Sequence, residues 1–434
     1  MTQPYVRDFE AFAANSGGKG PAWLPPLRHS AIERFSALGF PTTKNEDWHF
    51  TSVAPIAERE FHRAPHTTQG VAASDLAPFT FGHPEWTTMV FVDGRFSAAL
   101  SSITPLPAGL SVMDLQRAWR ENGAMLEQHL TRVAAFEKDA FMALNTAFMH
   151  DGVVVHVAAD TVVEHPIHLI FVSTGSRGEL ITHPHNLVVA DNNARVTVVE
   201  SYVSLGDAAY FTNSVSEMVL REGSTLTYIK LQHESERAFH VGNVHAKQER
   251  DSHFVSFSFA TGAALSRTNI HTRLGGEGSG ASLNGLYMVN GEQHVDHQTL
   301  VEHVEPNTFS REVYKGILDG ASHGVFNGRV YVYAEAQKTD GKQQNNNLLL
   351  SDRARIDTKP QLEIYADDVR ATHGATVGRL DDQALFYMKS RGISPAHARK
   401  LLTYAFAADV IEAIEVDAIR EELEKLTLNR FVAE

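Results

Sequence analysis

The chain has 434 residues, of which 43% are hydrophobic and 21% are charged, a balance typical of a globular protein with a large core. Its formal net charge of -14 argues against a nucleic acid or an anionic membrane as the main partner, because both attract a basic surface. The sequence has no cysteine. Disulfides, thiol nucleophiles and metal or cluster sites held by this chain's own thiolates are therefore excluded.

The first of three predicted domains, residues 1–150, is expected to be mainly helical. Ser30 and Glu33 have the spacing of a capping box, which predicts the start of a short helix, and Gly39 is a typical helix stop. Apolar residues recur at helical spacings in the range 125–149, which predicts a longer helix there. The N-terminal sequence does not resemble a signal peptide, and no run of about 18 apolar residues occurs, so we expect a cytoplasmic protein that does not enter a membrane.

The second predicted domain, residues 151–380, is rich in Val, Ile, Thr, Tyr and Phe, and turns of Gly, Asn, Asp and Ser divide it into many short strands. A polar turn, a small residue and an alternating strand recur, for example at 191–198, 222–229 and 351–356, at intervals of roughly 25 to 32 residues. No helical pattern interrupts these strands, so βαβ units are not expected. The repetition favours a mainly β fold, a β-helix whose coils stack on one another; a sandwich or jelly roll is the competing architecture.

The third predicted domain, residues 381–434, is expected to be helical again. Ser394 and Pro395 are typical of a helix start, and a second helix is expected from about Asp417. One face of the first helix carries an apolar stripe made of Leu401, Leu402, Ala405, Phe406, Val410, Ile411 and Ile414. Two interpretations remain open: the stripe caps the open end of the β-domain, or it docks another protein.

The stretch Gln337–Gly378 combines an amide-rich segment, an apolar run and an alternating strand with Asp367, Asp368 and His373. Two carboxylates and an imidazole so close together suggest a site for acid–base chemistry or for a metal ion. The two aspartates follow the end of the strand at Tyr365, however, and Asp is favoured in turns. Turn residues and a surface histidine are therefore the simpler interpretation of this pattern.

A second candidate metal site contains His294 and Asp296, which project from the same face of a predicted strand. With a distal histidine they would complete a two-histidine, one-carboxylate site for Fe(II), and this supports an alternative function, an Fe(II)-dependent oxygenase on a jelly roll. The chain has 23 histidines, so such a string arises easily by chance. Hydrogen bonding of His294 and His297 on a β-helix face is the simpler interpretation.

Other enzyme classes find little support in the sequence. Neither Gly-Lys pair of the chain is followed by Ser or Thr, so the chain is not expected to hydrolyse nucleotides itself. A polysaccharide-active β-helix enzyme is disfavoured because no secretion signal is recognised.

Several long strings occur in an order that resembles the SufB/SufD family of iron–sulfur cluster assembly scaffolds. Besides Gln337–Gly378 they are PTTKNEDWHFT from Pro41, FMALNTAFMHDG from Phe141, GLYMVNGEQHVDHQT from Gly285 and YKGIL from Tyr314. The resemblance covers nearly the whole chain. It implies a right-handed parallel β-helix flanked by helical N-terminal and C-terminal domains.

The resemblance also implies a site. In this family the B subunit, SufB, is implied to carry the essential acceptor thiolates, so a chain without cysteine resembles the D subunit, SufD. The histidine of the D-D-V-x-x-x-H-G-A-T string is implicated in cluster formation at the interface of the two subunits, and that position is His373 here. Family chains commonly have Cys where this chain has Ala371, which leaves His373 as the candidate metal ligand of the string. Imidazole ligates cluster iron alongside thiolates in known sites.

The function implied by the resemblance is that of a non-enzymatic scaffold subunit. It would bind no cofactor as an isolated chain and would share a transient iron–sulfur cluster with SufB. A SufB-like paralogue is the expected partner at the β-helix edge, and a SufC-like ATPase is the expected partner of the C-terminal helices, residues 381–434. No nucleic acid and no membrane is expected as a partner, and a homodimer is a further expectation for the isolated chain.

Overall fold

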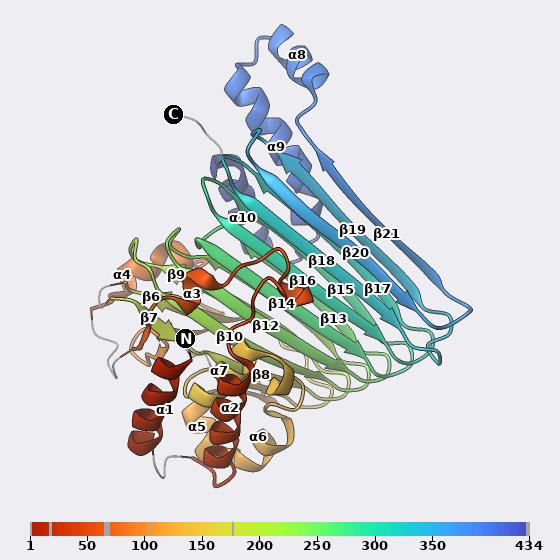
Figure 1. Ribbon diagram of the computed structural model, residues 1–434. Helices are drawn as coiled ribbons and strands as arrows, with labels where there is room; N and C mark the ends of the chain where they lie inside the picture. Colours follow the sequence, from red (N-terminus) through yellow and green to blue (C-terminus); the bar gives the residue numbers. More distant parts are fainter. Residues whose placement is uncertain (1, 17–19, 65–69, 104, 176–177, 431–434) are drawn as a thin grey trace.

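The computed structural model describes residues 2–16, 20–64, 70–103, 105–175 and 178–430, and two facing β-sheets form its centre (Figure 1). Sheet A has 11 strands: β1 (His62–Arg63), β4 (Leu110–Asp114), β5 (Val153–Val157), β7 (Leu180–Thr182), β8 (His185–Ala190), β10 (Phe211–Leu220), β12 (Phe239–Gln248), β14 (Leu265–Leu274), β16 (His294–His303), β18 (His323–Val332) and β20 (Arg355–Ile364). Sheet B has 10 strands: β2 (Thr87–Val92), β3 (Arg95–Phe96), β6 (Ile167–Ser173), β9 (Arg195–Ser204), β11 (Thr225–His233), β13 (His253–Ala260), β15 (Gly280–Val289), β17 (Phe309–Leu318), β19 (Asp340–Leu349) and β21 (Arg370–Gly378).

From β8 onward, consecutive strands belong alternately to the two sheets, so each coil of the chain adds one strand to each sheet. Each of these strands pairs in parallel with the strand two further along, as β10 does with β12 and β11 with β13. This arrangement is a solenoid, and helices flank it at both ends of the chain. The predicted mainly β solenoid with flanking helices is confirmed. The sandwich and jelly roll are wrong, because those architectures consist of antiparallel sheets.

One corner of the solenoid repeats the same backbone geometry in successive coils. A residue with positive φ stands there about every 30 residues, as expected for stacked repeats: Asp160, Asn193, Gly223, Asp251, Gly278, Asn307 and Lys338. Its N–H donates to a carbonyl of the next coil, for example from Asn193 to Glu222 over 2.9 Å. The recurring polar turn of the sequence is this corner, where the chain enters a strand of sheet B. The string 351–356 instead leads into β20 of sheet A, so it belongs to a different corner.

Alternate residues of each strand face the inside of the solenoid, where aromatic rings fill much of the space. Tyr202, Tyr228 and Tyr314 are fully buried there. Some polar groups inside are paired: the buried carboxylate of Glu200 accepts hydrogen bonds from the hydroxyls of Tyr202 and Tyr228, both over 2.8 Å. The interior therefore combines an apolar core with local polar networks of this kind.

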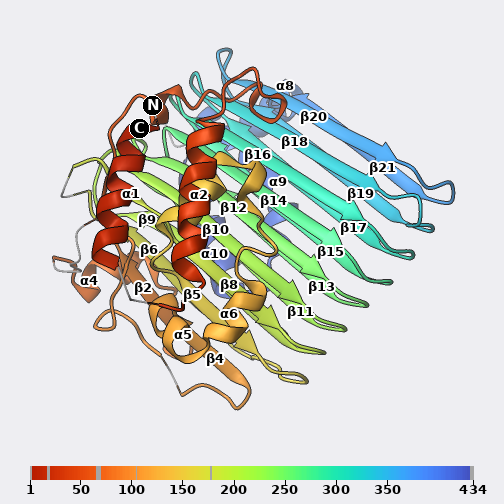
Figure 2. The ribbon, with the colours of Figure 1, turned by 60° about the horizontal axis from the view of Figure 1, so that its bottom comes forward.

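The N-terminal helices cover the outer face of sheet A (Figure 2). Three of them, α1 (Gln3–Ser16), α2 (Leu24–Leu38) and α7 (Ala140–Phe148), share an apolar cluster with β10, β12 and β14. Two further helices, α5 (Leu115–Glu121) and α6 (Gly123–His129), share a second apolar cluster with β5, β8 and β10. Shorter helical turns also occur: α3 (Ala54–Ala57), α4 (Ala73–Leu76), η1 (Glu46–Trp48), η2 (Ala77–Phe79) and η3 (Phe136–Lys138).

Two details of the N-terminal prediction are wrong. The helix predicted within 125–149 is split into α6, η3 and α7, because the N–H groups of Thr131, Val133 and Ala134 donate to the buried carboxylate of Glu217 instead of continuing a helix. The helix predicted to begin at Ser30 begins at Leu24, where two prolines occupy its first turn, a position that tolerates Pro. The predicted stop is confirmed, since Gly39 has φ 66° and its N–H donates to the carbonyl of Phe35.

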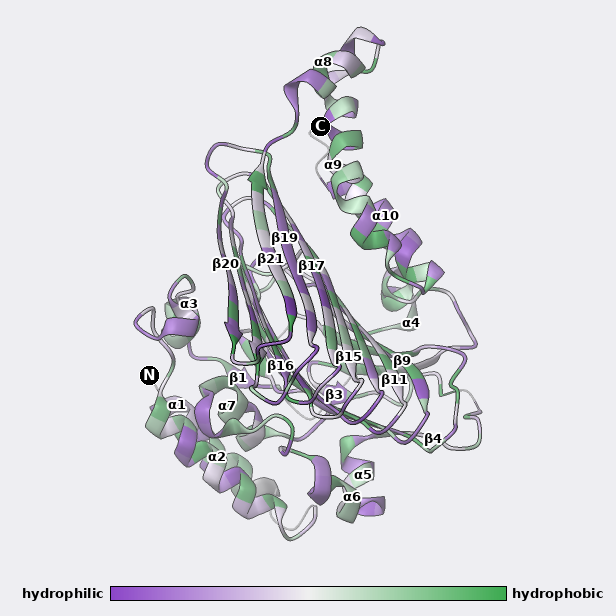
Figure 3. Ribbon diagram, turned by 90° about the vertical axis from the view of Figure 1, so that its right-hand side faces the viewer, coloured by the Kyte–Doolittle hydropathy of each residue, from purple (hydrophilic) through white to green (hydrophobic). Residues whose placement is uncertain are grey.

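The C-terminal helices lie along the opposite side of the solenoid (Figure 3). They are α8 (Asp382–Ser390), α9 (Pro395–Glu412) and α10 (Asp417–Arg430). The predicted start of α9 is confirmed: the Ser394 hydroxyl accepts a hydrogen bond from the N–H of His397. Val410 and Ile411 of α9 and Leu423 of α10 pack against the outer face of sheet B. The stripe thus covers the side of the solenoid, and the interpretation that it caps the open end is wrong.

None of the helices within the described ranges is long and apolar enough to cross a membrane.

Candidate functional site

The C-terminal end of the solenoid leaves two strand edges open. β20 is the last strand of sheet A and β21 is the last strand of sheet B, and among the described residues no strand pairs with their outer edges. Every residue of both strands is at least partly exposed. Val377 on β21 is 52% exposed, and Tyr365, just after β20, is 60% exposed. An edge of this kind is a template for pairing with another chain.

His373 lies on β21, in the middle of this open end. Its register partner on β19 is Gln343. Gln343 faces the inside of the solenoid and is 3% exposed, and paired residues of parallel strands share a face. His373 therefore faces the open interior and is itself exposed. Its imidazole is available to a group that arrives from outside the chain.

The amide-rich segment before it has a structural role. Gln343, Asn345 and Asn347 face the interior of the solenoid and are buried, whereas Gln344 faces outward. Asn347 Nδ2 donates to Asn345 Oδ1 over 2.6 Å, and the hydroxyl of Tyr287 donates to Asn347 Oδ1 over 2.6 Å. The first bond lies within β19 and the second reaches β15, two coils earlier, while Asn345 Nδ2 also donates to the carbonyl of Tyr314 in the preceding coil over 3.3 Å. The amides therefore help to hold the last turns of the solenoid together. Of the three leucines that follow, Leu348 is buried.

Asp367 and Asp368 lie in the bend between β20 and β21. The carbonyl of Asp368 accepts a hydrogen bond from the N–H of Lys338, and its own N–H donates to Gln337 Oε1 over 2.9 Å. Both bonds use the backbone. The interpretation of this pair as turn residues is consistent with this geometry, and their backbone contacts do not contribute to an acid–base pair.

The His294–Asp296 string lies on the outer face of sheet A, where both side chains contact Thr51. The Thr51 hydroxyl donates to Asp296 Oδ2 over 2.6 Å and lies 2.9 Å from His294 Nε2. Arg267 on the neighbouring strand forms a buried ion pair with Asp296 Oδ2 at 2.8 Å. The carboxylate is already neutralised by this guanidinium. Within the described part of the chain, no group of three His, Asp or Glu side chains is placed to hold a metal ion.

The next residue of the string, His297, faces the interior of the solenoid. It is 1% exposed, and its ring stacks on that of Tyr287 with centroids 5.2 Å apart. Burial lowers the pKa of His297 to about 4, so the ring is neutral near pH 7. Among the described residues, neither histidine of the string belongs to a group of side chains that could hold a metal ion, and the oxygenase alternative is not supported.

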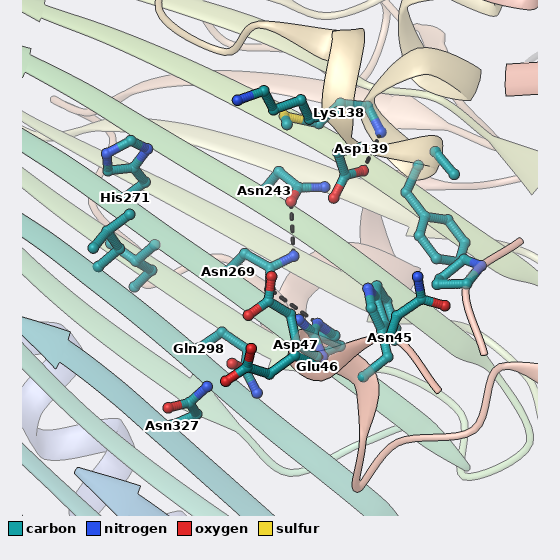
Figure 4. A pocket seen from close by; sticks show the side chains of 18 of the residues that line it. Asn45, Glu46, Asp47, Lys138, Asp139, Asn243, Asn269, His271, Gln298 and Asn327 are labelled. Atoms are coloured by element: carbon teal, nitrogen blue, oxygen red, sulfur yellow. Dashed lines mark hydrogen bonds between the residues drawn. The ribbon is translucent and has the colours of Figure 1, made fainter. Parts of the chain in front are cut away.

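A polar cavity of about 420 Å³ lies between sheet A and the segment that follows α2 (Figure 4). Asn243, Asn269, Gln298 and Asn327 occupy matched positions on four neighbouring strands, so their amides form a row along it. Asn269 Nδ2 donates to Asn243 Oδ1 over 2.7 Å. Asp47 lies on the side of the cavity opposite sheet A. The row offers donors and acceptors but no cluster of metal-binding groups.

Two of the sequence strings serve as anchors. In PTTKNEDWHFT, Trp48 lies under the guanidinium of Arg267, which also donates to the carbonyl of Asp47 over 2.6 Å; the segment is thereby attached to sheet A. In YKGIL, Lys315 on the outer face of sheet B donates from Nζ to the carbonyl of Phe406 over 2.7 Å, which attaches α9. These residues are structural.

The exposed part of the C-terminal region is α8. Phe386 is 74% exposed and Tyr387 is 60% exposed, and no residue of α8 is buried. Val410 and Ile411, which the apolar stripe of the sequence includes, are buried against sheet B. The buried part of the stripe is therefore core. The aromatic surface of α8, which the sequence pattern did not indicate, is an exposed apolar surface of the C-terminal helices.

Comparisons with known proteins agree with this architecture. A family model described as SUF system FeS cluster assembly, SufBD core domain, matches residues 171–406, and one described as the SufBD protein N-terminal region matches residues 1–169. The chain belongs to the SufBD family.

Individual relatives span almost the same length. The iron–sulfur cluster assembly protein SufD of Escherichia coli is 32% identical over 402 residues, which cover 92% of this chain and 91% of that protein. SufD of Bacillus subtilis is 27% identical over 445 residues, which cover 98% and 96%. An iron–sulfur cluster assembly SufBD family protein of Synechocystis is 32% identical over 407 residues, which cover 91% and 88%. These relatives support a role in iron–sulfur cluster assembly.

Proposed function

We propose that this chain is a non-enzymatic scaffold subunit that completes a cluster-assembly site only when a SufB-like paralogue binds to its open end. The observation that carries the proposal is His373, an exposed imidazole that faces the open interior between two strand edges with which no described strand pairs. The iron–sulfur cluster is the substrate of the complex, formed there and passed on. His373 supplies one ligand, and the thiolates come from the partner, because this chain has no cysteine.

Pairing with the SufB-like paralogue uses the edges of β20 and β21. Both strands are long, with 10 and 9 residues, and no described strand pairs with the backbone groups of their outer edges. A second β-helix placed end to end would satisfy these groups and would cover Val377 and Tyr365. The same edges offer a surface for a second copy of this chain, which explains why we expect a homodimer when the partner is absent.

A SufC-like ATPase docks on the C-terminal helices, and the aromatic surface of α8 is the part we assign to it. The ATPase supplies the nucleotide hydrolysis for which this chain has no P-loop. Movement of the ATPase would be transmitted through α9, whose carbonyl at Phe406 is bound by Lys315 of β17. We place this work in the cytoplasm, where thiols stay reduced. The domain division 1–150, 151–380 and 381–434 remains part of this proposal.

The test is reconstitution of the three-subunit complex with the His373→Ala variant. We expect assembly of the complex to persist and the iron and sulfide bound per complex to fall about 10-fold or more, because one ligand of the site is lost. The matched control is Thr372→Ala, an exposed neighbour on the same strand whose side chain faces outward. Cluster yield equal to that of the wild-type complex would remove His373 from the site.

A second measurement tests the edge pairing independently of cluster chemistry. Replacing Ala375 at the middle of β21 with Pro removes a backbone donor from that edge. We expect loss of the SufB-like partner and retention of the SufC-like ATPase in the same pull-down. Loss of both partners, or of neither, would contradict the assignment of the open end.

A further inference from the structure

Three interior residues form a column that ends at His373. Glu312 on β17, Gln343 on β19 and His373 on β21 are register partners in successive coils of sheet B. Paired residues of neighbouring strands lie about 4.8 Å apart and share a face of the sheet. Gln343 is thus the interior side chain directly beneath His373, and Glu312 is the one beneath Gln343.

The side chain of Gln343 is held in place by a residue of the preceding coil and by the backbone of the opposite sheet. Its Nε2 donates to Glu312 Oε2 over 2.7 Å, and both residues are buried. Gly328 on β18 makes room for it, since a Cβ at that position would lie 2.3 Å from Gln343 Nε2. The amide nitrogen therefore has a fixed place, between the Glu312 carboxyl group and the backbone of the opposite sheet.

The other end of the same amide has no partner. Gln343 Oε1 is buried and accepts no hydrogen bond from any residue that the structure describes. A buried carbonyl oxygen without a donor is unfavourable, and native interiors rarely leave one. The interior position next to it in the coil above belongs to His373, whose side chain is exposed.

We propose that Gln343, anchored by Glu312, is the positioning residue for His373: its Oε1 accepts one ring N–H and leaves the other ring nitrogen facing out of the open end. This inference rests on the proposed function of His373. A metal-binding histidine commonly donates its second ring N–H to an oxygen acceptor, which fixes the tautomer and the ring orientation. Here the acceptor belongs to a side chain that neither binds the cluster nor contacts the partner.

The first test uses the isolated full-length chain with ¹⁵N-labelled histidine. The His373 signals are identified by their absence in the His373→Ala variant, and their nitrogen shifts report the tautomer. We expect one dominant tautomer in the wild-type chain and a mixture in Gln343→Met, which keeps the length of the side chain but has no acceptor oxygen. Gln344→Met, an outward-facing neighbour, is the control. Identical His373 signals in wild type and Gln343→Met would overturn the inference.

The second test leaves Gln343 itself unchanged. Glu312→Gln keeps an oxygen that accepts from Gln343 Nε2, whereas Glu312→Leu removes it and releases the amide. We expect wild-type His373 signals in the first variant and mixed tautomers in the second, with both variants folded by circular dichroism. A Glu312→Leu chain that folds and keeps a single tautomer would overturn the role of the anchor.

Cluster formation in the three-subunit complex separates this inference from the proposed function. Gln343→Met and Glu312→Leu should lower cluster yield about 10-fold, as loss of a residue behind a metal ligand commonly does, and Glu312→Gln should restore it. If His373→Ala lowers the cluster yield but Gln343→Met does not, the positioning role of Gln343 is wrong and the proposed function of His373 stands. If His373→Ala has no effect, the proposed function of His373 fails first.

Discussion

Glu217 Oε1 and His185 Nε2 lie 2.8 Å apart on neighbouring strands of sheet A, and neither side chain is exposed. The same carboxylate accepts three backbone N–H groups of the loop between α6 and η3. One buried side chain thus determines where a helix is interrupted and attaches the N-terminal region to the solenoid. Charged groups at such sites are costly to leave unpaired.

The Glu217→Ala variant should therefore be strongly destabilised. It leaves His185 and three backbone donors without their acceptor, and we expect the free energy of unfolding to fall by about 3–5 kcal/mol. Urea denaturation followed by circular dichroism measures this. The control is Glu222→Ala, whose ion pair with Arg250 is exposed and should contribute little. Equal losses in the two variants would contradict the structural role of Glu217.

Asp296→Ala tests the assignment of the His294–Asp296 string as structural. The substitution leaves Arg267 buried without its carboxylate, so we expect a loss of stability of about 3 kcal/mol. Iron bound by the isolated chain, measured by elemental analysis after anaerobic purification, should be the same in wild type and variant. An iron content that falls from one per chain to none in the variant would revive the metal-site interpretation.

Because the carboxyl group of Glu312 is buried, we expect the stability of the folded chain to depend on pH. Burial raises the pKa of its carboxyl group from 4.5 to about 7, so the folded chain retains a proton that the unfolded chain releases. Stability is thus lost as the pH rises from about 4.5 to about 7, by about 3 kcal/mol in all, and no more above that range. The Glu312→Gln variant has no carboxyl group at this position, so this pH-dependent loss of stability should be absent from it.

Urea unfolding of both proteins at the two ends of this range measures the effect. The Glu312→Gln variant should gain stability relative to the wild-type chain at the higher pH, and the difference between the two should shrink at the lower pH. Comparison of the two proteins cancels the contribution of the buried histidines, which both contain. A difference that does not change with pH would show that Glu312 titrates normally in the folded chain.

Local signals in the sequence were sufficient for the repeating part of the fold. Strand alternation and polar turns depend on residues close in sequence, and Asn193 and Gly223 take positive φ because short or absent side chains tolerate it. The break between α6 and α7 was missed because its cause, Glu217, lies more than 80 residues further along. No periodicity within the helix segment reveals such a partner.

The candidate site was predictable only in part for a similar reason. His373 was singled out because its string resembles that of a known family, but the column beneath it depends on strand register, which joins residues about one coil apart. The His294–Asp296 string looked like a metal site because Arg267, its true partner, lies in the previous coil. The placement of α9 along sheet B likewise depends on contacts between distant segments, such as Lys315 with Phe406.

The exposed aromatic side chains of α8 predict that partner binding can be lost without a change in the stability of the fold. Replacing Phe386 and Tyr387 together with Ser should not change the free energy of unfolding measurably, because both rings are mostly exposed, but it should abolish capture of a SufC-like ATPase in pull-downs. Val410→Asp is the contrasting variant: this side chain is buried against sheet B, so a carboxylate there should lower stability whether or not the ATPase is present. Normal capture by the double variant of α8 would show that the ATPase binds elsewhere.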